Sequence, residues 1–203
     1  MTAMMTLCAL ALTLAMIAVN ERHLVEGKAF TWSPATGRGD DFALRSRDDA
    51  LQNAEQILAL GRGVSTNSAT LTVSNMFFMN LAQGEDPVDL WNRASGSLLN
   101  LGLFTRNGSY VVLGRAQKIR SAILNNDDNL DVSIDRHLQF CESAVADMKR
   151  VAFTAQRALE NLLSARADQE REIKGTLRQV AIIQGLIQDL IAAFQRLIQN
   201  VGL

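Results

Sequence analysis

The amino-acid sequence predicts a mainly α-helical protein built from an apolar N-terminal helix, a small helical middle part with one β-hairpin, and a long C-terminal helix. Two patterns predict this fold class. Residues 1–19 contain no charged side chain, and apolar residues recur at alternating spacings of four and three from Ile134 to Val201. Proline occurs only twice in 203 residues, so few positions interrupt a helix.

The composition is that of a folded chain and excludes several functional classes. Apolar residues make up 48% of the sequence and charged residues 20%, which excludes a disordered or low-complexity protein. The net charge of −1 gives no broad basic surface for nucleic acid. Two cysteines are too few for a disulfide scaffold.

Residues 1–19 form the first predicted helix, and we interpret it as a membrane anchor. Nineteen helical residues span roughly 28 Å, close to the hydrocarbon thickness of a bilayer. Two alternatives remain: a helix buried in a large assembly, and a cleaved signal peptide, although the segment has neither a basic start nor a suitable Ala-x-Ala site. The residues predicted to contact the membrane are Leu7, Leu10, Leu12, Leu14 and Ile17.

A connector over residues 20–41 precedes the middle part, which covers residues 42–129. Loop-forming residues such as Ser33-Pro34 mark the connector. The spacing of Leu44, Leu51 and Leu58 predicts a helix over residues 42–60, and the glycines at 61 and 63 predict its end. Residues 65–81 fit either a strand or a helix, with the helix favoured.

The second half of the middle part carries a helix start and a turn signal. Asp86-Pro87 predicts a helix start, because an aspartate caps the helix and proline suits its first position. We expect that helix to end near Gly96. Asn107-Gly108, which suits a type I′ turn, lies between two apolar runs and predicts a β-hairpin over residues 98–113. A short helix over residues 114–124 and a polar break at residues 125–129 follow.

Residues 130–203 are predicted to form one long coiled-coil or bundle helix. Its four–three stripe is apolar at every position except Arg166, Gln169 and Thr176. A continuous helix over about 70 residues would be roughly 105 Å long and would need partner helices to cover the stripe. A hairpin at Gly175 is the alternative to continuity.

The distal half of this helix is predicted to drive self-association, because its large apolar side chains would otherwise form an exposed patch. The residues predicted to make the oligomer contact are Ile183, Ile187, Leu190, Phe194, Leu197 and Val201.

The sequence contains no recognisable catalytic, cofactor-binding or metal-binding motif. Phosphate-binding loops, nucleophile elbows and dinucleotide fingerprints are all missing. The two histidines, His23 and His137, are far apart in sequence, and the cysteines Cys8 and Cys141 fit apolar positions. We therefore expect no enzymatic activity, no cofactor and no small-molecule substrate.

The sequence indicates a non-enzymatic structural subunit of a larger, membrane-associated oligomer. Its expected partners are further copies of itself, other subunits and a membrane. A secretion or pilus-like envelope machine and a virion component that contacts a membrane are suitable settings. The alternative is a secreted or periplasmic helical binding module, produced after removal of residues 1–19 as a signal peptide.

Overall fold

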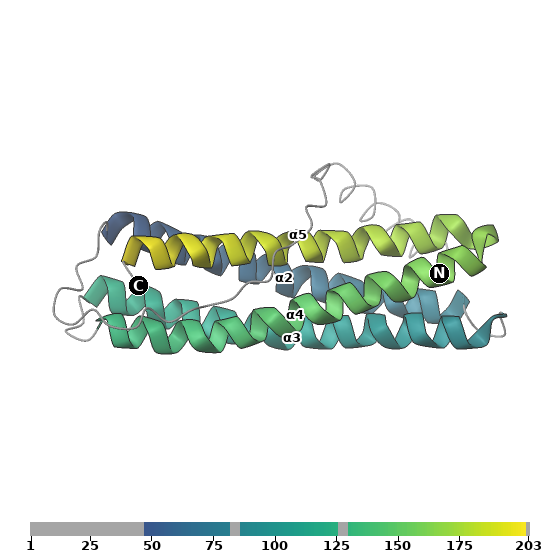
Figure 1. Ribbon diagram of the computed structural model, residues 1–203, viewed down its shortest axis with the longest axis horizontal. Helices are drawn as coiled ribbons and strands as arrows, with labels where there is room; N and C mark the ends of the chain where they lie inside the picture. The colour runs from purple at the N-terminus through teal and green to yellow at the C-terminus, as the bar shows by residue number, and fades with distance from the viewer. Residues whose placement is uncertain (1–46, 82–85, 126–129, 202–203) are drawn as a thin grey trace, which may run out of the picture.

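The computed structural model describes residues 47–81, 86–125 and 130–201, and these residues are almost entirely helical. Four long helices lie side by side as a bundle (Figure 1): α2 (Arg47–Leu81), α3 (Val88–Asn125), α4 (Leu130–Ala165) and α5 (Glu170–Val201). A single 3₁₀ turn, η1 (Ala167–Gln169), joins α4 to α5. The prediction of a mainly α-helical protein is confirmed for these residues, whereas the predicted helix at residues 1–19 and the connector lie outside them.

Each helix packs against two neighbours in the order α2, α3, α4, α5 and back to α2. Contacts between neighbours show that they run antiparallel. Gly61 of α2 faces Leu113 of α3, and Ser68 of α2 bonds Thr105 of α3, so residue numbers increase along one helix as they decrease along the other. Gln184 of α5 bonds Gln156 of α4, and the two residues lie at similar distances along the chain from the tight turn at residues 167–169, so these helices also run antiparallel. The short connections and this register define an up-down-up-down four-helix bundle.

The core of the bundle is one cluster of buried apolar residues contributed by all four helices. The apolar four–three stripe of the sequence supplies the α4 and α5 residues of this core. Every apolar member from Ile134 to Val201 is buried. The stripe therefore identifies the inward faces of both helices.

The predicted continuous C-terminal helix is wrong, because the chain reverses after Ala165. Arg166 leaves the helical conformation at φ −128° and ψ 60°, and its amide still donates to the Leu162 carbonyl at 2.8 Å. The alternative, a helical hairpin, is correct in kind, but the turn lies at Arg166, nine residues before Gly175, which is inside α5. The two stripes then cover each other within one chain.

The predicted β-hairpin over residues 98–113 is also wrong, since these residues lie in the middle of α3. The apolar runs around Asn107-Gly108 also match a helical period. Leu98, Leu101, Thr105 and Val112 recur at spacings of three, four and seven, and all four are buried in the bundle. Asn107-Gly108 is a turn signal that tertiary packing overrides.

The helix end predicted at Gly61 and Gly63 is wrong, because α2 continues through both glycines to Leu81. A Cβ atom built on Gly61 would lie 3.1 Å from Leu113 Cδ2, so the glycine lets α3 approach α2 closely at this point. The preference for helix over residues 65–81 is thereby confirmed. The predicted start at Asp86-Pro87 is confirmed within one residue, because Leu90 and Trp91 donate to the Pro87 carbonyl, but α3 does not end near Gly96.

Candidate interaction surface

The six residues predicted to drive self-association lie in the core of the bundle. Ile183, Ile187, Leu190, Phe194, Leu197 and Val201 are each 3% exposed or less. The premise that they form an exposed patch on one chain is therefore wrong, because α2 and α4 cover α5. The membrane residues Leu7, Leu10, Leu12, Leu14 and Ile17 lie outside the described residues.

One stretch among the described residues, Ala167–Val201, has the length and apolar composition of a membrane span. Its apolar face is the one that packs against α2 and α4. The core helix of a soluble bundle meets the same criteria, so this stretch is compatible with membrane association without requiring it.

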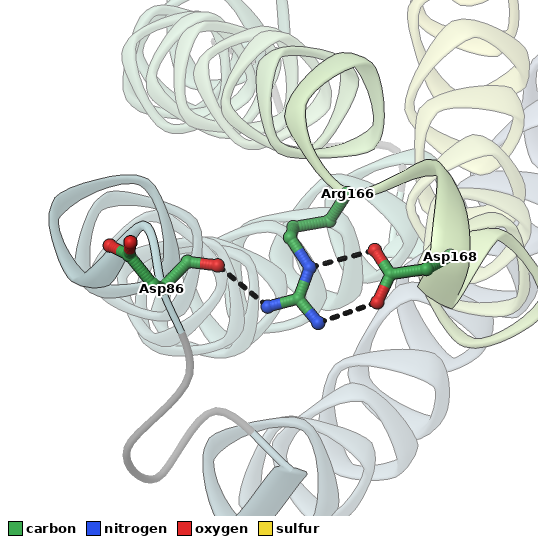
Figure 2. Close-up of polar contacts among 3 residues, drawn as sticks. All are labelled: Asp86, Arg166 and Asp168. Carbon is green, nitrogen blue, oxygen red and sulfur yellow. Dashed lines mark hydrogen bonds and ion pairs between the residues drawn. The ribbon is translucent and has the colours of Figure 1, made fainter.

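Arg166 connects the two inter-helix turns at one end of the bundle (Figure 2). Its guanidinium binds the Asp168 carboxylate through two hydrogen bonds, from Nε to Oδ1 at 2.8 Å and from Nη2 to Oδ2 at 2.7 Å. Nη1 donates to the Asp86 carbonyl at 2.7 Å. The hydrogen bonds from Arg166 lower the pKa of Asp168. Arg166, a polar member of the four–three stripe, thus ties the start of α3 to the reversal between α4 and α5.

Burial shifts the pKa values of two titratable residues on α4, Cys141 and His137. Cys141 is buried in α4, and this burial raises the pKa of its thiol to about 12. Burial and the nearby cations of Arg115, Lys118 and Arg136 lower the pKa of His137. Within residues 47–81, 86–125 and 130–201, no three His, Cys, Asp or Glu side chains gather in a way that could hold a metal ion.

The most unusual surface of the bundle is a charge-free face on α2 and α3. Residues 63–81 of α2 and 94–105 of α3 contain no Asp, Glu, Lys or Arg. Thr72 lies against Gly102, so the two uncharged segments are side by side. Five large apolar side chains on these segments are between 47% and 64% exposed, and we call them the α2–α3 face: Val73, Met76, Met79, Leu99 and Leu103.

The α2–α3 face was not identified from the sequence, although its signal was present. No charged residue occurs between Arg62 and Glu85. A solvent-facing helix normally carries charged residues on its outer side. An uncharged, partly apolar outer side is typical of a surface that contacts another molecule.

A second surface feature lies in the outer groove between α3 and α4. It is a shallow hollow of about 360 Å³ near the end of the bundle that Arg166 closes. Its walls carry Arg93 and Ser97 from α3, and Phe153 and Arg157 from α4. The guanidinium of Arg157 lies 5.6 Å from the centre of the Phe153 ring.

No family model matches the chain, and no match to a curated protein or to a solved structure was found.

Proposed function

We propose that this protein is a non-enzymatic, membrane-tethered assembly subunit, in which the four-helix bundle associates with further copies of itself through the α2–α3 face. The exposed, charge-free α2–α3 face is the observation that carries this proposal. The uncharged segment at residues 1–19 supplies the tether. A secretion machine and a virion are settings that suit such a subunit.

The size of the α2–α3 face suits a weak contact with a second copy. Its nineteen residues on α2 extend about 28 Å and its twelve residues on α3 about 18 Å, each as a strip roughly 10 Å wide. Two such faces would together bury roughly 900 Å², which is the range of weak, concentration-dependent contacts. A two-fold pairing requires a self-complementary surface, and an uncharged face has no like charges to repel its copy.

The side chains of the face fit a contact surface better than a solvent surface. Met76 and Met79 are flexible and adapt to a partner, which is typical of methionine at contact surfaces. Packing inside the bundle does not account for these residues, because Met76 is 64% exposed. Full burial of a large side chain is worth roughly 1.5–3 kcal/mol, so these half-exposed side chains would each contribute about half of that. The sum over five side chains is comparable with the lower values given for the entropic cost of association, which again corresponds to a weak contact.

Sedimentation of the full chain in mild detergent tests the assembly through this face. We expect a concentration-dependent oligomer, and we expect Met76→Glu and Leu103→Glu each to weaken it more than tenfold, since a carboxylate would be buried without a partner. Val132→Glu is the matched control, because Val132 is 54% exposed on α4, away from the face. Circular dichroism should show that all three variants keep the helical content of the original chain.

A monomer at all concentrations, or equal weakening by Val132→Glu, would overturn assembly through the α2–α3 face. Flotation with liposomes tests the tether in the same preparations. The full chain should float with the vesicles, whereas a chain that lacks residues 1–19 should stay at the bottom of the gradient. Equal flotation of both chains would contradict the tether.

A further inference from the structure

The outer groove between α3 and α4 combines arginines with exposed aromatic rings along much of its length. Arg157 lies over Phe153, Arg150 lies 6.0 Å from the ring of Phe104, and Arg115 lies 3.9 Å from the ring of Phe140. The last two pairs join α3 to α4 across the groove. From residue 157 to residue 140 of α4, this row extends about 25 Å.

The hollow at one end of the row is cationic and lacks a balancing anion. Arg93 lines it from α3 and Arg157 from the adjacent α4, and none of its lining residues carries a carboxylate. In the part of the chain that the structure describes, neither arginine forms an ion pair. Ser97, Thr154 and Asn161 add hydrogen-bonding side chains, while Leu90 and Phe153 add apolar surface. Planar guanidinium groups favour carboxylates, which they bind through two parallel hydrogen bonds.

We propose that the α3–α4 groove is a docking site for an acidic peptide segment of a partner protein, with its carboxylates on Arg93 and Arg157 and an apolar side chain against Phe153. This inference does not depend on the proposed assembly through α2 and α3, which lies on a different surface. The length of the groove favours an elongated segment over a small anion, because the row of arginine–aromatic pairs continues beyond the hollow. Charge complementarity selects acidic sequences over neutral or basic ones.

The charges of α4 favour a peptide over an anionic membrane surface. Asp135, Glu142 and Asp147 lie on the same helix as Arg150 and Arg157, and Asp147 forms an ion pair with Arg150. A lipid surface is recognised by clusters of basic residues with a continuous positive potential. The two arginines that line the hollow, Arg93 and Arg157, instead match individual carboxylates at defined places.

Fluorescence anisotropy with the full chain in mild detergent tests the proposal. The probe is a fluorescein-labelled peptide of twelve residues, made of glutamate and alanine with one central leucine. We expect saturable binding that weakens as salt is raised, and at least tenfold weaker binding with Arg93→Gln or Arg157→Gln. Arg178→Gln, an exposed arginine on α5, is the matched control and should change the affinity less than twofold.

Three outcomes would overturn the proposal. The first is equal binding of the peptide in which every glutamate is replaced by glutamine. The second is equal weakening by Arg178→Gln, which would show unspecific attraction of charge. The third is that the acidic peptide does not bind, whereas vesicles of phosphatidylglycerol do bind and require Arg93 and Arg157. This result would assign the groove to a membrane surface.

Discussion

Replacement of Gly108 by alanine should destabilise the bundle, although alanine is normally the better helix former. A Cβ atom built on Gly108 would lie 2.8 Å from Met148 Cγ and 2.9 Å from its Sδ. Met148 is fully buried in α4, so its side chain has little room to withdraw. The clash should cost about 1–3 kcal/mol, and the higher helix propensity should return about 0.5–1 kcal/mol. We therefore expect a net loss of about 1 kcal/mol in the free energy of unfolding.

Two other glycines of α3 provide matched controls. Gly96 and Gly114 are exposed, and nothing lies within 4 Å of a Cβ atom built on either. Gly96→Ala and Gly114→Ala should each stabilise the protein by about 0.5–1 kcal/mol. Urea unfolding followed by circular dichroism measures the difference between these variants and Gly108→Ala.

A double-mutant cycle with Met148→Ala isolates the clash itself. Met148→Ala alone should cost about 2–5 kcal/mol, because it empties a buried site. In that background Gly108→Ala should become stabilising, since the obstructing side chain is gone. A Gly108→Ala variant that is as stable as Gly114→Ala, with no coupling to Met148, would refute the close packing of α3 on α4 at this point.

Further substitutions test the core of the bundle and the buried Cys141. Leu190→Asp should unfold the bundle, because it buries a carboxylate without a partner; the free energy of unfolding should fall by more than about 3 kcal/mol. Gln188→Asp, on the exposed side of α5, is the control and should change that free energy by less than about 0.5 kcal/mol. A well-folded Leu190→Asp chain that only changes its oligomeric state would place Leu190 at a contact between chains. Cys141 should resist iodoacetamide at pH 8 until the protein unfolds, because its thiol stays protonated; peptide mapping measures this. The free energy of unfolding should also fall as the pH rises from about 9 towards 12, because the thiol ionises over this range in the unfolded chain but keeps its proton when it is buried. Cys141→Ala should remove this part of the pH dependence.

The sequence by itself determined which faces of the last two helices are buried. The four–three spacing from Ile134 to Val201 depends only on the helical period. The hydrophobic effect buries this face whichever helix packs against it. It also determined within one residue where α3 begins, because Pro87 fixes φ directly before the first helical residue, Val88. The absence of charge between Arg62 and Glu85, which marks the α2–α3 face, is equally a property of the sequence.

Tertiary structure alone decided where the chain turns and which helix covers which. The spacing of four and three residues continues through Arg166 and Gln169, so an antiparallel hairpin and a continuous helix give the same sequence pattern. The reversal of the chain depends on the contacts of Arg166 with Asp168 and with the distant Asp86 carbonyl. The local turn signal of Asn107-Gly108 was overridden because Gly108 lies where Met148 of α4 approaches α3. A glycine serves both turns and close packing, and only the neighbouring helix distinguishes the two uses.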